Sequence, residues 1–502
     1  MLDRPAILAA DTPLKSRPSR GPFRPEIWLN ARERSSVRLS AHYFRLIDVL
    51  MVCGLAFSAV LAIQPTGLAS ITVGDLASIT VGDAAPVVIG AVLVLVLMRA
   101  LQLYRFGRDT PWPLHMAGVV GVGVVSAGVV LVLGWLLDRP ALDVIAPWTL
   151  TTTAALAVLH GLWLVVIARW RRLGVLSPNI VIVGATRNAR RLIEQALERR
   201  DMNVLGVFDD RLARSPESVA GVPVLGDAKA LLTHRLTPYV DRIVLAIDPE
   251  AGQRVRDLTQ TLNALPNPLT VLVDPELGRD GLLNRLANAP LASLDGPVDP
   301  DRRAFNKRMQ DLVIGAAALV VAAPIMALVA LAVKLDSPGP VFFRQRRHGF
   351  NHETIVVWKF RSMRHEAADA SASRQVCPGD DRVTRVGRFI RATSLDELPQ
   401  IFNVLSGEMS LVGPRPHAIG MKTGETESAL LVAEYAHRHR IKPGMTGWAA
   451  IKGSRGPVDT EAQVRERVQL DIEYIERQSF WLDLWVIAVT IPVLLGDRAA
   501  VR

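Results

Sequence analysis

The hydropathy pattern is dominated by four long apolar runs in the first third of the chain. Each run approaches or exceeds the roughly 20 residues that an α-helix needs to cross a bilayer. They span Leu46–Ile63, Val87–Leu103, Leu114–Leu137 and Ile145–Ala168. The pattern predicts four transmembrane helices over residues 46–170. The Arg- and Pro-rich residues 1–45 before them predict a disordered cytoplasmic tail without a cleavable signal peptide.

Positive charges flank these runs unevenly. The tail is basic, loop 64–86 has no Lys or Arg, and the fourth run ends in Arg169, Arg171 and Arg172. Because positive residues accumulate on the cytoplasmic side, both ends of the four-helix unit are expected in the cytoplasm.

Residues 178–300 alternate short apolar segments with amphipathic ones, which predicts a parallel, doubly wound, Rossmann-like sheet. The predicted strands are Asn179–Gly184, Val204–Asp209, Val222–Leu225, Arg242–Ile247 and Leu269–Val273. The first turn reads G-A-T-R-N-A from Gly184, so only the first glycine of a G-x-G-x-x-G loop is in place. Asp209 ends the second strand, where a ribose-binding acid would lie. A degenerate structural or regulatory sheet is favoured over an intact dinucleotide site.

A fifth apolar run, Asp311–Val333, differs from the others because Pro324 interrupts it and both of its flanks are basic. The flanking residues are Arg302, Arg303, Lys307 and Arg308, then Lys334, Arg344, Arg346 and Arg347. A spanning helix has asymmetric flanks, and proline kinks or breaks a helix. The run is therefore expected to be re-entrant, breaking at Pro324 and leaving on the cytoplasmic side. An ordinary fifth span would place the following residues outside the cell. The tryptophan-rich Ser479–Leu495, interrupted by Asp483, is typical of an interfacial helix.

Composition agrees with a membrane protein. The 502 residues are 50% hydrophobic, with net charge +10 and mean hydropathy +0.25, which favours anionic lipids or anionic substrates as partners. Nucleic acid is not expected, because only 5 Tyr and 13 Phe are available to stack bases. Cys53 and Cys377 predict two unpaired thiols. His417, His437 and His439 lack metal-ligand spacing and are expected at the surface.

The adjacent carboxylates Asp396 and Glu397 are the strongest candidates for chemistry. Ser394-Leu-Asp-Glu397 can be read as a capping box that begins a helix, where free N–H groups favour phosphate. Neighbouring carboxylates repel unless a cation is close, and Mg²⁺ takes one or two carboxylates together with water and substrate phosphates. A carboxylate ionised near a metal can attack phosphorus. The structural alternative is that both acids only complement the helix dipole.

Cations surround this pair in the sequence. Arg391 is the last member of a basic stripe that also contains Arg382, Arg385 and Arg388. Arg415 lies between two prolines, and a rigid Arg can bind phosphate with a bidentate fork. Lys359 and Arg361 follow the apolar strand Thr354–Val357 and are two further candidates for phosphate binding. Each cation alone could be a solvated surface residue.

Four motifs in the last 200 residues resemble the bacterial sugar transferases, which are polyprenyl-phosphate hexose-1-phosphate transferases. They are K-F-R-S-M from Lys359, R-x-x-S-L-D-E-L-P-Q from Arg391, N-V-L-x-G-x-M-S-L-V-G-P-R-P from Asn403 and K-P-G-x-T-G-W-A from Lys442. The resemblance covers about residues 302–495. It implies a small α/β catalytic domain over residues 301–502. The complete chain, with its membrane unit and degenerate nucleotide-binding-like domain, is similar to the long form of the family.

The resemblance implies a role for several of these residues. Asp396 matches the nucleophile that attacks the sugar-linked phosphorus of a UDP-sugar, so that UMP leaves and a covalent phosphosugar-aspartyl intermediate forms. Undecaprenyl phosphate then accepts the sugar phosphate. Glu397 matches the Mg²⁺ ligand, and Lys359, Arg391 and Arg415 match cations that hold phosphates.

The match also bears on the membrane helix and on the sugar. Pro324 matches the break of the family's re-entrant helix. Ala450 stands where relatives often carry Gln, and Lys452 where Asn is common, which weakens inferences about the nucleotide-sugar pocket. The pairs Arg455-Gly and Asp459-Thr resemble glucose-type members. UDP-galactose or another UDP-hexose is the alternative donor.

Two other readings belong to different functional classes. A membrane-bound nucleotide-sugar dehydratase would need an intact Gly-rich loop and Tyr-x-x-x-Lys, and no tyrosine of this chain has Lys four residues on. A non-enzymatic export scaffold would not need intact Asp396, Glu397 and Arg415. The favoured function is the first step of exopolysaccharide or capsule repeat-unit synthesis at the bacterial inner membrane. The sequence leaves open whether the protein forms a homodimer.

Overall fold

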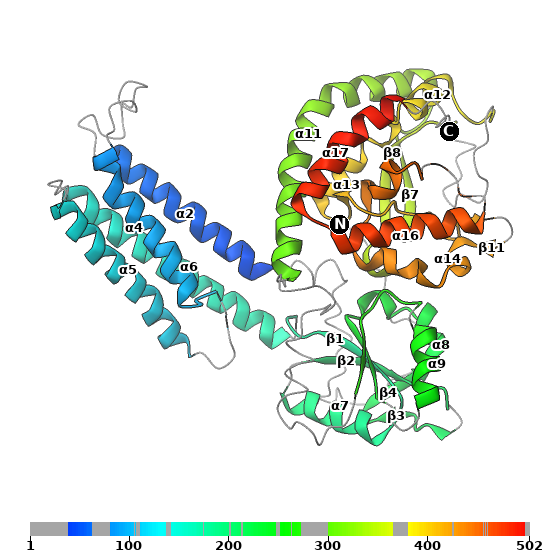
Figure 1. Cartoon of the computed structure of the whole chain (residues 1–502), viewed down its shortest axis with the longest axis horizontal. Coiled ribbons are helices and arrows are strands. Elements are labelled where there is room, and N and C mark those ends of the chain that lie inside the picture. The colour runs from blue at the N-terminus through cyan, green and yellow to red at the C-terminus, as the bar shows by residue number, and fades with distance from the viewer. Residues whose placement is uncertain are drawn as a thin grey trace.

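A computed structural model defines the fold, in which three regions follow one another along the chain (Figure 1). The described residues are 39–62, 81–104, 106, 111–136, 142–173, 175–199, 202–211, 214–246, 252–262, 264–272, 300–364, 380–423, 426–454, 456, 458 and 460–496. Residues 1–38 of the predicted tail and Cys377 lie outside this set. Ser40 already begins a helix, so the predicted tail extends too far at its end.

Four apolar helices form the first region and pack side by side (Figure 1). They are α2 (Ser40–Ala62), α4 (Val81–Ala100), α5 (Trp112–Leu136) and α6 (Leu142–Leu173). Val52, Val94 and Val130 lie in the core that the helices share, whereas Leu50 and Val124 are more than half exposed, as lipid-facing residues would be. Among the described residues, α2, α5 and α6 are long and apolar enough to span a membrane, and so is a fourth helix, α11 (Pro300–Asp336).

A chain of polar side chains crosses the interior of this unit. The Nε2 atom of His160 lies 3.0 Å from a carboxylate oxygen of Asp48, and its Nδ1 atom lies 2.9 Å from Nε2 of His115. All three residues are buried. Since polar groups between apolar helices are stabilised by pairing with one another, this chain ties α2, α6 and α5 together.

The second region is a six-stranded sheet in the order β3-β4-β2-β1-β5-β6. Its strands are β1 (Asn179–Val183), β2 (Asn203–Phe208), β3 (Ser218–Val219), β4 (Val222–Gly226), β5 (Arg242–Leu245) and β6 (Leu269–Val271). All pairs are parallel except β3 with β4. Its helices are α7 (Arg187–Arg199), α8 (Ala228–Thr233), α9 (Gly252–Leu262) and the 3₁₀ helix η4 (Thr237–Tyr239). Every strand predicted from the apolar pattern forms in the structure.

Alternate residues of β1 face two different cores, as they must in a sheet that is covered on both sides. Ile180 and Ile182 pack against α7, whereas Val181 and Val183 face the core that contains α8 and α9. Figure 1 shows α7 on one side of the sheet and α8 with α9 on the other.

The third region consists of short strands and helices, and the long helix α11 lies along their outside (Figure 1). Its first elements are α11 (Pro300–Asp336), β7 (Phe342–His348), η6 (Phe350–His352), β8 (Thr354–Phe360), α12 (Arg385–Ala392), η8 (Leu395–Glu397) and α13 (Gln400–Ser406). It continues with β9 (Ser410–Val412), β10 (Lys422–Thr423), β11 (Thr426–Glu427), α14 (Ser428–Leu431), η9 (Ala433–Arg440), β12 (Gly444–Thr446), α15 (Trp448–Ile451), α16 (Glu461–Arg477) and α17 (Phe480–Gly496). The strands β7 and β8 pair antiparallel, and β9 and β12 pair parallel.

Helix α11 is continuous over 37 residues, so the predicted break at Pro324 is wrong. Proline removes one backbone hydrogen bond and bends a helix without necessarily ending it. Figure 1 shows α11 curving along the outside of the third region. Near its start, Arg308 donates to the carbonyls of Val404 and Leu405, at 2.6 and 2.7 Å. Near its end, Arg361 donates to the carbonyls of Val333 and Ser337, so both ends contact the same domain.

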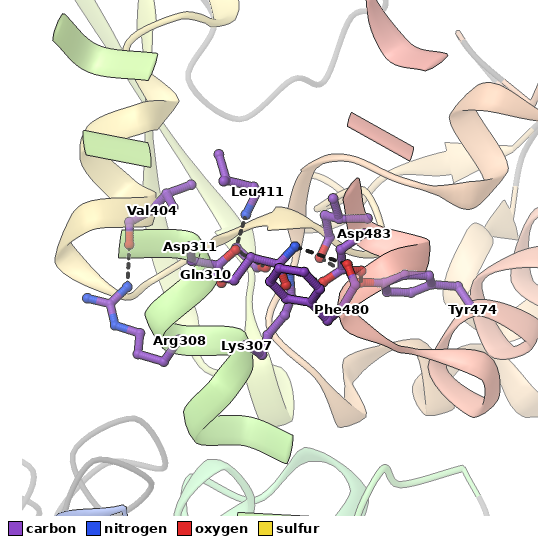
Figure 2. A network of polar contacts seen from close by, with 11 residues as sticks. Lys307, Arg308, Gln310, Asp311, Val404, Leu411, Tyr474, Phe480 and Asp483 are labelled. Atoms are coloured by element: carbon purple, nitrogen blue, oxygen red, sulfur yellow. Dashed lines mark hydrogen bonds and ion pairs between the residues drawn. The ribbon is translucent and has the colours of Figure 1, made fainter. Parts of the chain in front are cut away.

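A buried ionic network fixes the start of α11 to α17 (Figure 2). The Nζ atom of Lys307 lies 2.8 Å from a carboxylate oxygen of Asp483 and 3.1 Å from one of Asp311. Asp311 also accepts from the backbone N–H of Leu411, at 3.0 Å, and Asp483 accepts from the Tyr474 hydroxyl, at 2.6 Å. Asp483 thus lies within α17 and binds it to α11, as does Gln310, whose amide donates to the carbonyl of Phe480 at 3.3 Å.

Candidate active site

Glu397 forms the centre of a compact ionic cluster. Its Oε1 atom lies 2.7 Å from Nζ of Lys359 and 2.6 Å from a terminal nitrogen of Arg415, and the second Arg415 nitrogen donates to Oε2 at 3.2 Å. Lys359 comes from the end of β8, and Arg415 from the segment after β9. The three side chains are 14 to 31% exposed, so a ligand can reach them while the local dielectric stays low.

The two neighbouring carboxylates have opposite electrostatic surroundings. Burial raises the pKa of the Asp396 carboxyl, Lys359 lowers it, and the charge of Glu397 raises it further. Burial also opposes ionisation of Glu397, but Arg415 and Lys359 outweigh it and hold the pKa of this carboxyl well below its usual range. Pairs of acids whose pKa values are driven apart are typical of active sites. The two surroundings thus favour the anion at Glu397 and oppose it at Asp396.

The predicted capping box is not present. Ser394 has a left-handed backbone, with φ 56°, and its side chain caps no helix; the short 3₁₀ turn η8 follows, and α13 begins only at Gln400. A capping residue needs an extended backbone, which Ser394 lacks. This sharp turn ends α12 and directs Glu397 toward Lys359.

Close backbone contacts hold the segment that carries Arg415. The N–H of Gly413 donates to Thr446, and that of Gly444 to Pro414, each at 2.9 Å. A β-carbon on Gly444 would lie 2.1 Å from the nitrogen of Gly413, so a side chain there would separate the two segments. This contact gives a physical reason for the glycines in both motifs, V-G-P-R-P and K-P-G-M-T-G.

Two residues that the sequence patterns did not single out complete this support. Arg438 is almost fully buried, donates to the carbonyl of Arg415 at 2.9 Å and pairs with Asp471 at 2.7 Å. Asn403 accepts from the N–H of Trp358 and donates to the carbonyl of Val356, so it joins α13 to the strand that carries Lys359. Asn403 lies within a recognised motif, whereas Arg438 lies in a basic run without one.

Arg361 and the arginine stripe do not all reach the pair of acids. The guanidinium of Arg361 is buried and donates to carbonyls at the end of α11, so here it supports the helix. Arg382 precedes α12 and pairs with Asp380 at 2.6 Å. Arg391 lies in the last turn of α12, and its charge lowers the pKa of Asp396. The structure therefore brings Lys359, Arg391 and Arg415 to the pair.

The prediction that the three histidines lie at the surface is wrong for two of them. His417 and His439 are about 5% exposed or less. His439 packs against His352 with ring centroids 4.3 Å apart, and His417 accepts or donates a hydrogen bond at 2.6 Å with Tyr435. Burial holds the pKa values of His417 and His439 well below the usual range, with help from Arg438. Both rings are neutral and belong to the core.

Asp209 in the sheet region is satisfied by its own chain. Its carboxylate accepts from the backbone N–H groups of Ala185 and Arg211, at 2.8 and 2.9 Å, and from Arg254 at 3.1 Å. Asp209 is only 3% exposed. The acid that would bind a ribose in an intact dinucleotide site is thus used to close the turn after β1.

Comparison with known proteins places these features in a family. The description "bacterial sugar transferase" matches residues 302–497, and "CoA-binding domain" matches residues 115–271. A UDP-glucose:undecaprenyl-phosphate glucose-1-phosphate transferase of Xanthomonas campestris pv. campestris is 38% identical over 345 residues, which are 66% of this chain and 69% of that protein. The protein with that name in Escherichia coli (strain K12) is 35% identical over 341 residues, 66% and 71% of the two chains.

A relative with a different sugar in its name is equally similar over a shorter stretch. A UDP-N-acetylgalactosamine-undecaprenyl-phosphate N-acetylgalactosaminephosphotransferase of Aeromonas hydrophila is 39% identical over 198 residues, 39% of this chain and 45% of that protein. Long apolar helices and a matching transferase domain make the chain a membrane-bound transferase. It belongs to the bacterial sugar transferase family.

Proposed function

We propose that the protein transfers hexose 1-phosphate from a UDP-sugar to undecaprenyl phosphate as the first step of building an exopolysaccharide or capsule repeat unit. Glucose 1-phosphate is the favoured group, because the relatives that match two thirds of the chain are named for it. The observation that carries this proposal is the cluster of Asp396 and Glu397 with Lys359 and Arg415. UDP-galactose or another UDP-hexose is the second candidate donor.

In this proposal Asp396 attacks the phosphorus that carries the sugar. The Asp396 oxygen–phosphorus bond forms, the bond to the bridging oxygen of UMP breaks, and UMP leaves with the electron pair. An oxygen of undecaprenyl phosphate then attacks the same phosphorus and displaces the Asp396 carboxylate. Lys359, Arg391 and Arg415 supply the positive charge that offsets the negative phosphates, which is the main contribution a protein makes to phosphoryl transfer.

Mg²⁺ is part of the proposal, and the two acids suit it. Mg²⁺ is bound by one or two carboxylates and completes its shell with water and substrate phosphates, and Asp396 and Glu397 are adjacent. The described residues contain no group of three or more metal-ligating side chains. Glu397, with a low pKa, would hold the ion, which would supply further charge to the phosphates. Lys359 and Arg415, which now pair with Glu397, would then bind phosphate oxygens instead.

We further propose that α11 is re-entrant and that the third region lies at the cytoplasmic face of the inner membrane. A straight helix of 37 residues would be about 55 Å long, enough to cross a bilayer core of roughly 30 Å. Both ends of α11 nevertheless contact one domain, through Arg308 and Arg361. Its central residues Val320, Val321 and Leu328 are about 70% exposed, as expected of a surface that dips into lipid.

The sheet region is proposed to be a Rossmann-like structural or regulatory domain without a dinucleotide, which the closed turn at Asp209 supports. It contacts the transferase domain directly. Asn351, in η6, donates to the carbonyls of Pro238 and Val240, and Asn267 donates to Asn351 at 2.9 Å.

The reaction is tested with membranes that contain the protein, given Mg²⁺, undecaprenyl phosphate and a panel of UDP-hexoses. Release of UMP together with a diphosphate-linked lipid sugar is expected, with UDP-glucose the best donor. No UMP release with any UDP-hexose would refute the proposal. Exchange of labelled UMP into UDP-sugar without undecaprenyl phosphate tests the covalent intermediate, because only a two-step route allows it.

The topology is tested by cysteine labelling. Single cysteines at Arg302 and Pro340, both at exposed positions, are introduced into a chain that lacks Cys53 and Cys377. Both are expected to label from the cytoplasmic side, unlike a control cysteine at Gln64. Labelling of the two sites from opposite sides would show that α11 crosses the membrane.

A further inference from the structure

A cavity of about 240 Å³ adjoins the ionic cluster. Glu397 and Arg415 line one part of it, and the rest is formed by β9, β12, α15, α16 and α17. Pockets for complete small-molecule ligands usually have about 300–1,000 Å³. The cavity therefore suits one part of a nucleotide sugar, next to the residues that would hold the phosphates.

Two buried ionic side chains of α16 also line the cavity. Arg467 is 4% exposed and Asp471 is 2% exposed, and they lie four residues apart on one face of the helix. Arg467 donates to the hydroxyl of Ser454 and to the carbonyl of Gly456, each at 3.0 Å. Asp471 pairs with Arg438 at 2.7 Å. These contacts hold a donor and an acceptor in place beside the cavity.

Apolar side chains form other parts of the lining. Leu398, Leu411, Met445 and Ile487 line the cavity, and Ala450 contributes only a methyl group. A hexose ring has hydroxyl groups around its edge and C–H groups on its faces. A cavity with fixed polar groups and apolar walls matches both, and it lies where the sugar must lie once its phosphate is held by Arg415.

We propose that this cavity binds the hexose of the nucleotide sugar, with Arg467 and Asp471 hydrogen-bonded to its hydroxyl groups and Ala450 limiting its size. This inference rests on the proposed function and adds the residues that select the sugar. Arg438 is a positioning residue in this arrangement, because it holds both Asp471 and the carbonyl of Arg415.

The decisive variant is Ala450→Phe, which fills more of the cavity than the Gln that relatives often carry and leaves the ionic cluster's charges unchanged. The KM for UDP-glucose is expected to rise about tenfold or more, as for other misfits in a substrate pocket. Inhibition by UMP, which lacks the hexose, is expected to stay within about twofold of wild type. Ala462→Phe, on the exposed face of α16, is the matched control and leaves both values unchanged.

Each alternative outcome overturns the inference. If UMP inhibition weakens as much as the KM for UDP-glucose rises, the cavity binds the nucleoside and not the hexose. An unchanged KM would show that the cavity lies outside the substrate path. Wild-type membranes that transfer no hexose phosphate would instead refute the proposed function, so the two failures are distinct.

A second variant, Asp471→Asn, tests the hydrogen bonding. The ratio of kcat/KM for UDP-glucose to that for UDP-galactose is expected to change about tenfold or more, because a lost acceptor changes discrimination between hydroxyl positions. If the variant folds and kcat/KM falls equally for UDP-glucose and UDP-galactose, Asp471 does not select the sugar. Ala450→Phe keeps the test valid should Asp471→Asn fail to fold.

Discussion

Asp209 in the sheet region and Glu397 in the transferase domain are both carboxylates that an arginine contacts. Asp209 directly follows β2, and Glu397 ends the 3₁₀ turn η8. Asp209 is closed off, because two backbone N–H groups and Arg254 occupy its oxygens. Glu397 is held by the side chains of Lys359 and Arg415, and Glu397 and Arg415 line a cavity. Side chains can exchange a carboxylate for a phosphate, whereas backbone donors that close a turn cannot. Residue type alone therefore does not separate a binding site from a structural ion pair.

The largest effect is expected from Asp396→Asn, compared with Asp209→Asn. Loss of the proposed nucleophile should reduce transfer by about 10³-fold or more, as for other nucleophiles, while Asp209→Asn should stay within about twofold. UMP release from membranes, normalised to protein amount, measures both. Near-wild-type turnover of Asp396→Asn would show that Asp396 is not the nucleophile.

Arg415→Lys should reduce kcat by about 10²-fold. Lysine keeps the charge but loses the two-pronged contact that Arg415 makes with Glu397 and would make with phosphate. The control is Arg254→Lys, whose only described partner is Asp209. Equal small losses in both variants would mean that the geometry of Arg415 is unimportant.

The pH dependence of kcat/KM should have an acid limb set by Asp396. Burial and Glu397 raise its pKa, so activity should fall as the pH drops through a value above the ordinary Asp pKa of about 3.9. In Glu397→Gln the neighbouring charge is lost, the pKa of Asp396 falls, and the acid limb of the residual activity should move to lower pH. A shift to higher pH would contradict this electrostatic assignment.

The smallest effect on activity, with a clear effect on stability, is expected from Asp209→Asn. The amide cannot accept from all three donors, so we expect a loss of about 1–3 kcal/mol in the stability of the sheet domain. Thermal unfolding of the purified protein measures it. A large loss of transfer in a stable Asp209→Asn protein would instead show that the sheet controls the enzyme.

Periodicity and motifs predicted the secondary structure more accurately than they predicted the tertiary contacts. The five apolar segments of residues 178–300 all became strands, because alternating burial on two faces is written into neighbouring residues such as Ile180 and Val181. The pattern Ser394-Leu-Asp-Glu397 predicts a helix cap, yet Ser394 has a left-handed backbone and Glu397 instead pairs with the distant Lys359. Arg361 was a phosphate candidate, yet it supports α11.

The sequence by itself determined the three-part organisation, the apolar helices and the small set of charged residues around Asp396, because these depend on local pattern and residue type. Only the tertiary structure decided which charges meet. It separated Asp209 from Glu397, sent Arg361 to a helix end, buried His417 and His439, and placed Arg467 and Asp471 beside a cavity. These outcomes depend on contacts between residues far apart in the chain, and a sequence pattern does not say how close such residues lie in space.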